Sequence, residues 1–241
     1  MEKVQFGRKS IEYSVKRGRR KRSIAINITP DAEVIVRVPH FLSEEKIEKV
    51  VTKKAPWILS KQDYFRKLSE LYPEKEFESG EQILFLGRRY RLKLKRDNNN
   101  IDYPVVSGRK ILLSIDKSMR LEDRKQRIKN ILTKWYFYET GNIIKQRVRR
   151  YAKFLGVRPR KISVKEQKKR WGSCSNRGTL RFNWRISMAP MSIIDYVAVH
   201  ELCHLKAKNH STDFWKFVSL ALPDYQQRRQ WLKNNSQMLK L

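Results

Sequence analysis

Apolar and polar residues alternate with the period of β-strands through most of the first half of the chain. Ile24, Ile26 and Ile28 alternate with smaller or polar residues, which is the pattern of a half-buried strand. Such runs are separated by turn-forming residues, as around Gly87 and Gly108. The predicted strands lie within residues 11–15, 23–28, 33–38, 80–95 and 103–115.

A helical period appears once within this region and dominates after it. Ser43 is the expected N-cap of a helix that continues to about Leu71, with Pro56 as a break or kink. From Leu121 to Gly156 apolar residues recur at helical spacing, and Gly141 is a candidate break between two helices. The later pattern predicts strands at 162–164 and 179–186 and helices at about 192–206, 211–220 and 224–239.

This order of elements predicts an α+β protein in two parts. Residues 1–118 are expected to form a β-rich N-terminal region with one long helix, and residues 119–241 a second domain richer in helices. The boundary rests on the change of pattern near residue 118. The sequence shows neither an internal repeat nor a low-complexity linker.

The net charge narrows the range of expected partners. The chain has 55 Lys and Arg against 24 Asp and Glu, a formal net charge of +31 and a pI near 10.4. This charge favours nucleic acids or phosphorylated small molecules over a membrane surface, because the cations are scattered and form no single amphipathic anchor. Two dense runs are the predicted turn at 16–22 and the stretch Lys145–Arg170, and a merely solvated surface is the alternative interpretation.

Cysteine content and apolar segments indicate a cytoplasmic protein. Cys174 and Cys203 are too few for a disulfide framework. The chain has no apolar run long enough to span a membrane, and its first residues lack the apolar core of a signal peptide.

Three of the four histidines fall in the window 200–210. His200 and His204 are four residues apart, so on a helix they share one face and can bind one metal ion. Glu201 is rotated by about 100° from His200 and can reach a water molecule on that metal, and His210 follows where a third ligand is needed. This is the layout of a hydrolytic zinc site. A chance pattern on a surface helix is the alternative, which the apolar segment before His200 disfavours.

The segments around this window resemble a known family. They are the sequence RWGSC at 170–174, the strand 179–186, HELCH at 200–204, NHS at 209–211, and Phe214 with Trp215. Together with the opening strands and residues 55–58, these motifs resemble the YgjP-like metallopeptidase-domain family, relatives of the SprT and WLM zinc peptidases. The resemblance spans most of the chain.

The resemblance implies a zincin-like fold for residues 119–241, with the HExxH helix under a small sheet. The three histidines of the window would be the zinc ligands, and Glu201 would be the catalytic base. The histidine spacing also matches the metzincin signature, except that Ala207 stands where those enzymes carry glycine. Because alanine resists a left-handed turn, we expect the helix to run slightly further and to turn at Lys208–Asn209.

Candidate substrate contacts come from the strand 179–186 and the loop before it. The apolar side chains of this strand should pack on the core, leaving Arg181, Asn183 and Arg185 facing outward. In zincin-like enzymes such a strand flanks the cleft, so Arg181 and Asn183 are candidate contacts to a peptide, and a solvated strand face is the alternative. The other candidates, on a glycine-containing loop, are Arg170, Trp171 and Ser173.

Three functions remain open. A zinc-dependent hydrolase of the metallopeptidase type would use a metal-activated water and Glu201 as general base. The resemblance also implies a nucleotide pyrophosphatase, because hydrolysis of UTP has been attributed to members of the family, with Arg170, Arg181 and Arg185 neutralising phosphate charge. The third is a nucleic-acid-binding protein whose protease site acts on a bound partner, with Lys145–Arg170 as the binding face. The sequence favours the hydrolase, with Zn²⁺ as cofactor and a peptide or nucleotide as substrate.

Overall fold

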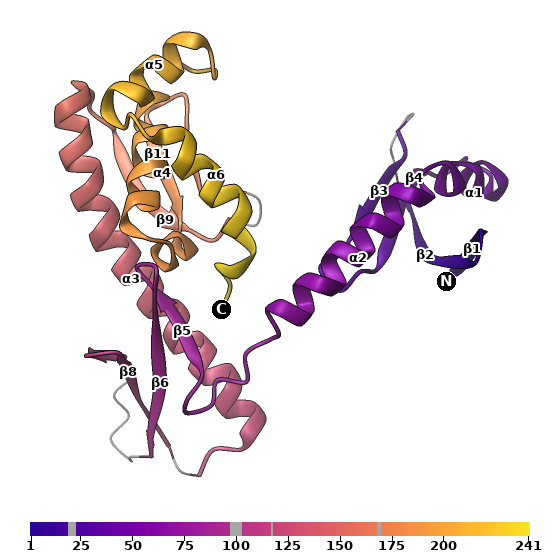
Figure 1. Cartoon of the computed structure of the whole chain (residues 1–241), viewed down its shortest axis with the longest axis horizontal. Coiled ribbons are helices and arrows are strands. Elements are labelled where there is room, and N and C mark those ends of the chain that lie inside the picture. Colours follow the sequence, from indigo (N-terminus) through magenta and orange to yellow (C-terminus); the bar gives the residue numbers. More distant parts are fainter. Residues whose placement is uncertain (19–22, 97–102, 117, 168–169) are drawn as a thin grey trace. The chain divides into compact units, whose positions relative to one another are not determined.

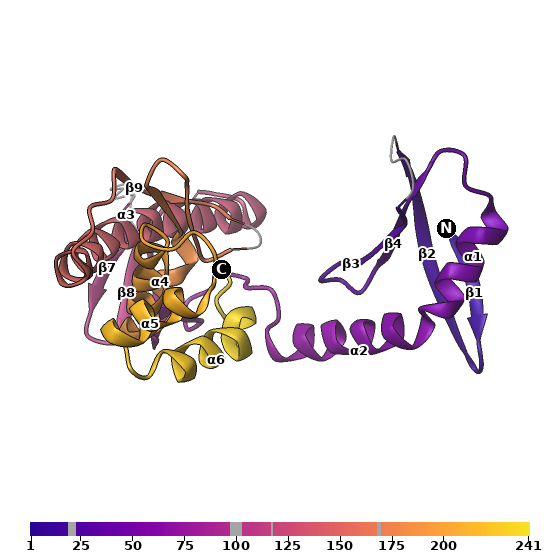
Figure 2. The same cartoon turned by 90° about the horizontal axis from the view of Figure 1, so that it is seen from above.

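The computed structural model describes residues 1–18, 23–96, 103–116, 118–167 and 170–241. It is a mixed α and β structure that divides into two compact units, Met1–Glu74 and Lys75–Leu241 (Figures 1 and 2). We call these the N-terminal and the C-terminal unit. Part of the basic run at 16–22, the loop at 97–100 and two positions of the stretch Lys145–Arg170 lie outside the described residues.

The N-terminal unit is a four-stranded sheet with two helices. Its strand order is β1-β2-β4-β3, in which β2 and β4 are parallel and the other neighbours antiparallel. The strands predicted at its start are confirmed, and β1 was not predicted. The elements are β1 (Glu2–Phe6), β2 (Lys9–Gly18), β3 (Ala25–Ile28), β4 (Val34–Pro39), α1 (Glu44–Lys53) and α2 (Ala55–Leu71).

The helices of this unit pack against an apolar core. Ile11 and Val36 of the sheet and Ile47 and Ile58 of the helices are fully buried in one cluster. The single helix predicted from residue 43 is two helices, and Pro56 lies in the first turn of the second, where its missing N–H costs no hydrogen bond.

The C-terminal unit begins with a second four-stranded sheet, of order β5-β6-β8-β7. Figure 1 shows the long helix α3 (Leu121–Leu155) running past this sheet and on to the β9–β11 region. Phe85 packs on Trp135 with ring centroids 4.7 Å apart, which ties the sheet to α3. The strands are β5 (Gln82–Phe85), β6 (Arg88–Arg96), β7 (Val105–Ser107) and β8 (Lys110–Ile115).

These two sheets form an internal repeat, which the sequence analysis missed. They share strand order, strand polarity and register: Tyr13 pairs with Val34 between β2 and β4 as Leu92 pairs with Ile111 between β6 and β8. A helix follows each sheet and buries isoleucine side chains, Ile47 in α1 and Ile128 in α3. The repeat consists of the same strand pairing and burial in both copies, while few residues are identical between their sequences.

The remainder of the C-terminal unit is a three-stranded sheet, of order β10-β11-β9, with helices around it. Strand β11 is antiparallel to β10 and parallel to β9. The elements are β9 (Lys161–Lys165), β10 (Gly172–Cys174), β11 (Thr179–Asn183), a 3-10 helix η1 (Trp184–Met188), α4 (Met191–Cys203), α5 (Thr212–Ala221), α6 (Tyr225–Asn235) and a 3-10 turn η2 (Ser236–Met238).

The structure differs from the expected organisation in two respects. The expected boundary near residue 118 falls inside the C-terminal unit, because Ile83 and Leu113 of the second sheet share one buried cluster with Leu132 of α3 and Val199 of α4. Gly141 does not break the helix, because α3 runs through it. Among the described residues, no helix combines the length and apolarity that a membrane crossing requires.

Candidate metal centre

Helix α4 is apolar on nearly every face. Its residues from Ile193 to Val199 are all buried, as are Leu202 and Cys203, so the helix is enclosed by the core of its unit. Asp195, the polar exception in that run, pairs with Arg147 of α3 through two hydrogen bonds, one of them 2.6 Å long. This pair fixes α4 against α3.

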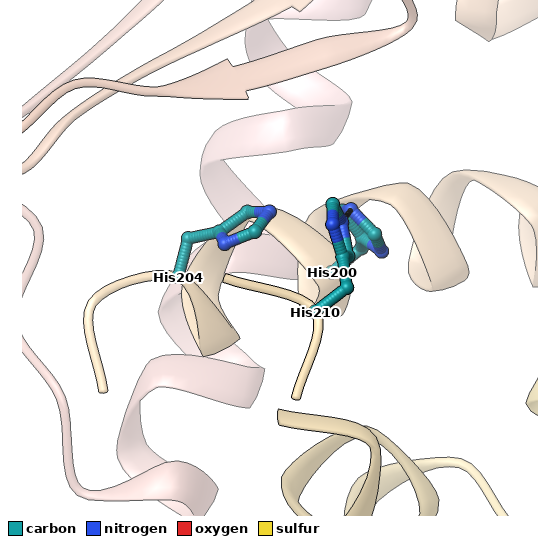
Figure 3. Close-up of side chains that lie close together, drawn as sticks. All are labelled: His200, His204 and His210. Atoms are coloured by element: carbon teal, nitrogen blue, oxygen red, sulfur yellow. Dashed lines mark hydrogen bonds between the residues drawn. The ribbon is translucent and has the colours of Figure 1, made fainter. Parts of the chain in front are cut away.

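The three histidines of the window 200–210 converge in space. His200 belongs to α4, His204 is its C-cap, and His210 lies just before α5. Their ring nitrogens lie within 4.8 Å of one another, and Figure 3 shows the three imidazoles gathered at the end of the helix. The Nε2 atoms of His200 and His210 are 3.1 Å apart.

This geometry fits a tetrahedral metal ion. Two nitrogens bound at about 2.0–2.1 Å with tetrahedral angles would lie roughly 3.3 Å apart, close to the distance between the Nε2 atoms of His200 and His210. The Nδ1 of His204 lies 3.2 Å from the carbonyl oxygen of Ala207, a contact that orients the ring and leaves Nε2 free for a ligand bond. An all-imidazole set suits zinc, copper, iron or nickel better than magnesium or calcium.

The surroundings of His200 and His204 keep these two imidazoles neutral, as metal ligation requires. Burial, followed by the neighbouring histidines and Arg229, lowers the pKa of His200 to about 3. Burial is also the main cause that lowers the pKa of His204. Both rings therefore offer a free electron pair at neutral pH.

Glu201 lies beside the triad in an apolar enclosure. The residue is 5% exposed, and its Oε2 has no hydrogen-bond partner among the described residues. Burial raises the pKa of Glu201 to about 8, against a smaller lowering by Arg170. A buried carboxyl whose pKa lies near neutrality can both accept and donate a proton, as a general acid–base group must.

Gly172 makes room for this carboxyl group. A Cβ atom at position 172 would lie 2.6 Å from both Cγ and Oε1 of Glu201, so no other residue fits without moving one of them. Gly172 belongs to edge strand β10, which the sequence analysis interpreted as a loop. The glycine of the RWGSC segment is thus a structural requirement of the Glu201 position.

Aromatic side chains from α5 and α6 form one wall of the centre. The ring of Phe214, fully buried, lies 4.6–4.9 Å from the three imidazoles, and Trp215 stacks on His210 at 5.7 Å. Arg229 lies over Trp215, with Cζ 4.9 Å from the ring centroid. Phe214 and Trp215 belong to the family motif, whereas Arg229 lies in a polar helix without any motif and could not be identified from the sequence.

The candidate substrate residues have unequal surroundings. Asn183, predicted to face outward, is 4% exposed: its amide donates to the carbonyls of Gln167 and Arg170, and its Oδ1 accepts the N–H of Arg185. The prediction was wrong because the strand ends at Asn183, which caps η1 and no longer follows the strand alternation. Arg181 is exposed.

The other three candidates lie along β10 or just before it. Ser173 pairs with Arg181, so both side chains lie on the sheet face opposite to Gly172. The carbonyl of Trp171 accepts the N–H of Asn183 at 2.8 Å, and Trp171 is half-buried. Arg170 is exposed, and its positive charge acts on Glu201. Of the five candidates, only Arg170 shows an interaction with the centre.

The end of α4 differs from the expected one. The helix ends at Cys203, and the N–H groups of Leu205 and Lys206 bond to the carbonyls of Leu202 and Cys203, three residues back, in a tightened final turn. Among the described residues, neither Ala207 nor Asn209 has a positive φ. The chain leaves the helix through this turn, so no left-handed residue is needed near 207–209.

Comparison with known proteins gives a match over most of the chain. A sequence model described as YgjP-like, metallopeptidase domain, matches residues 22–235. A search of the curated proteins gave no match. Among solved structures, the crystal structure of the metallopeptidase zymogen of Pyrococcus abyssi abylysin is similar: it is 22% identical, and the match covers 37% of this chain and 93% of that chain with a TM-score of 0.35. A likeness of that size does not define the fold.

Proposed function

The chain belongs to the YgjP-like metallopeptidase-domain family, and we propose that it is a zinc-dependent peptidase with a zincin-like catalytic centre. In this proposal His200, His204 and His210 hold the metal, and Glu201 is the general base. One observation carries it: three imidazoles converge at the end of α4, where Glu201 carries an enclosed carboxyl with an oxygen that has no partner among the described residues. Zinc, when bound, would polarise a scissile carbonyl and lower the pKa of water to about 7.

Glu201 performs the proton transfers in this mechanism. Its Oε2 accepts a proton from the attacking water and returns it to the leaving amine. The apolar enclosure supports this role, because it holds the pKa of Glu201 near neutrality and so makes both transfers accessible. Gly172 keeps the carboxyl group in place by leaving it the space it occupies.

The substrate would bind along β10. This strand is at the edge of its sheet, and its unpaired backbone groups can accept an extended peptide as a further strand. Because Gly172 lies against Glu201, a peptide bound there would pass the carboxyl group with its scissile bond. Main-chain hydrogen bonds would supply most of the recognition, so sequence selectivity would depend on the side chains around Trp171 and Ser173.

The test combines metal content with cleavage of unfolded casein. The wild type should bind about one zinc ion per chain and cleave casein, His204→Ala should lose both properties, and Glu201→Gln should keep the metal and lose at least about a hundredfold in rate. His40→Ala is the matched control, because His40 is an exposed histidine of the N-terminal unit. Zinc binding retained by His204→Ala, or full activity of Glu201→Gln, would contradict the proposal.

A nucleotide pyrophosphatase is the second candidate function. It is favoured by two exposed arginines whose charges reach the centre, Arg170 at Glu201 and Arg229 at His200. Arg185 is less suitable than the sequence suggested, because it donates to Glu166 at 2.9 Å and lies over Trp184. Incubation of the same variants with UTP decides between the two, since pyrophosphate release without casein cleavage would replace the peptidase proposal.

A further inference from the structure

A row of cations follows the outer face of the second sheet. On β6, Arg89, Arg91, Lys93 and Lys95 occupy alternate positions, and all four side chains are exposed. The residues between them, such as Leu92, point to the opposite face, where the sheet packs on the core with α3. We call these four residues the β6 row.

The neighbouring strands add positive charge to this face and no negative charge. Lys110 of β8 is the register partner of Arg91 and is also exposed. The other outward residues of the described strands β5, β7 and β8 are uncharged: Gln82, Leu84, Val105, Ser107, Leu112 and Ser114. In the described part of the chain, no salt bridge joins a member of the β6 row to a carboxylate.

Asp97, two residues after Lys95, lies outside the described residues, and among those described the carboxylate nearest in sequence to the β6 row is already occupied. Glu81, which precedes β5, accepts the N–H groups of Glu76 and Phe77 through its two oxygens. Lys75 lies near the row, since it donates to the carbonyl of Gln82 at 2.7 Å and the charge of Arg89 contributes to lowering its pKa, after burial. The face therefore has a surplus of cations that the described part of the protein does not neutralise.

Folding of the sheet does not require this row, as the internal repeat shows. Phe6 pairs with Lys9 at the β1–β2 turn as Phe85 pairs with Arg88 at the β5–β6 turn. Aligning these two pairs gives each residue of β6 an equivalent in β2. The positions of the β6 row are occupied in β2 by Ser10, Glu12, Ser14 and Lys16, whose charges sum to zero.

The row also has an energetic cost. Alternate residues on a strand are about 6.6 Å apart, and neighbouring strands about 4.8 Å, so these like charges repel one another in the free protein. The repulsion between these cations opposes folding, and the fold does not need them. A partner that neutralises their charge explains why they are there. The partner must present closely spaced negative charges along an extended line.

We propose that the outer face of the β5–β8 sheet binds the phosphate backbone of a nucleic acid, which runs along the β6 row. Binding would release counterions and depend steeply on salt. The outward residues include no aromatic side chain on which a base could stack, so the site would hold the backbone with little sequence preference.

This location differs from the one suggested by the sequence, the stretch Lys145–Arg170. There the cations lie mainly on α3, and part of their charge is used internally. Arg147 is paired with Asp195, and Arg150 lies over the ring of Tyr151 at 5.8 Å. Among the described residues, none is a comparable internal partner of the β6 row.

The experiment measures fluorescence anisotropy of labelled 20-nucleotide oligo-U RNA, oligo-dT and a 20-base-pair DNA duplex over a range of salt concentrations. The test variant carries Arg89→Gln, Arg91→Gln, Lys93→Gln and Lys95→Gln. It should lose at least about tenfold in affinity and flatten the log–log salt slope for single strands by about 3, given roughly 0.7 per phosphate contact. The control variant removes the same charge from exposed positions outside the sheet, through Lys145→Gln, Arg149→Gln, Lys153→Gln and Arg158→Gln, and should change affinity by less than about threefold.

Equal losses in both variants would mean diffuse attraction by the net charge and would overturn the proposal, as would unchanged binding by the test variant. Equal competition by polyglutamate, or tighter binding to phosphatidylserine vesicles, would also overturn it. Should the fourfold variant fail to fold, Arg91→Glu copies Glu12 of the other repeat and should weaken binding about fivefold or more. The result is independent of the metal centre, because His204→Ala should bind nucleic acid like the wild type.

Discussion

Gly172 is the residue at which the smallest change should have the largest catalytic effect. The Cβ of Gly172→Ala would lie 2.6 Å from Cγ and Oε1 of Glu201, so the carboxyl group or β10 must move. We expect proteolytic activity to fall by about ten- to a hundredfold, because a displacement of about 1 Å is enough to cost that much, while zinc content stays at the wild-type level.

Gly141→Ala is the matched control for this substitution. Its Cβ would meet only Cγ2 of Val164, at an ordinary 4.0 Å, within the long helix α3. Alanine is the better helix former, so this variant should be as stable as the wild type or more stable, by up to about 1 kcal/mol, and fully active. Wild-type activity of Gly172→Ala would show that Glu201 does not act from the position described.

The raised pKa of Glu201 predicts a pH-dependent stability in the metal-free protein. Below pH 4.5 the carboxyl is protonated whether the chain is folded or unfolded. As pH rises toward about 8, the unfolded chain releases a proton that the folded chain retains, so stability falls across this window. Glu201→Gln does not titrate.

The melting temperature of metal-free Glu201→Gln should therefore rise relative to that of the wild type between pH 5 and pH 8, by more than about 3 °C. Calorimetry in the presence of a chelator measures it. A constant difference between the two proteins over this range would show that the carboxyl is not shielded from water.

At the residue scale, spacing was enough to predict the convergence of the histidines. Two residues four positions apart on a helix share one face, so the proximity of His200 and His204 could be predicted from the sequence. The space that Gly172 leaves for Glu201 could not be predicted, because it depends on how closely β10 approaches α4. The burial of Asn183 was missed for a similar reason, since the strand ends at Asn183, three residues earlier than predicted, and its last residue caps η1.

At the scale of elements, the β5–β6 turn is joined to the segment that leads into α4. Leu86 and Gly87 donate their N–H groups to the carbonyls of Ser187 and Met188, at 2.7 and 3.0 Å. Gly87 has φ +74°, and a Cβ there would lie 2.7–3.0 Å from three atoms of Pro190, the N-cap of α4. Gly87→Ala should destabilise the C-terminal unit by about 2–4 kcal/mol, measured by urea denaturation.

Gly108→Ala separates the two causes of this loss. Gly108 lies in the turn between β7 and β8 of the same sheet with φ +55°, but nothing lies within 4 Å of the Cβ that alanine would add. Gly108→Ala should therefore lower the free energy of unfolding only by the strain of an alanine in the left-handed conformation, about 1–2 kcal/mol. If both variants lose the same stability, the contact between the turn and Pro190 contributes nothing.

Most elements followed from local pattern, and those that did not were decided by contacts distant in sequence. Strand β10 has only three residues and contains a glycine, so its pairing with β11 is what makes it a strand. Gly141 was a candidate helix break, yet α3 continues because Thr140 beside it is held in the core, where its hydroxyl donates to the carbonyl of Trp184 at 2.7 Å and lies 2.8 Å from Oγ of Ser187. The repeat could not be recognised from the sequence, because the register that the two copies share is a property of strand pairs.

At the scale of the whole molecule, the two buried clusters predict two unfolding transitions. Ile47 belongs to the core of the N-terminal unit and Ile128 to that of the C-terminal unit, and both are fully buried. Ile47→Ala should lower only the free energy of unfolding of the N-terminal unit, by about 2–5 kcal/mol, without changing zinc content. Ile128→Ala should lower the free energy of unfolding of the C-terminal unit, which zinc binding should raise. A single transition shifted by both variants in scanning calorimetry would contradict this.

The domain boundary shows the limit of composition as a guide. The change from strand pattern to helical pattern near residue 118 is real, but it falls between β8 and α3, two elements that bury their apolar faces against each other. A boundary follows shared burial, and in this chain the repeat unit of four strands and a helix begins again near Lys75.

The tightened end of α4 gives the metal centre an electrical polarity. His200 lies in the last turn and His204 at the C-cap, where the aligned peptide dipoles leave roughly half a negative charge. A cation held there is attracted by the helix itself as well as by its ligands. The same negative helix end repels an approaching phosphate group, whereas it does not repel a neutral peptide bond. Arg170 and Arg229 would have to offset that repulsion before any nucleotide could react, and a peptide has no such requirement.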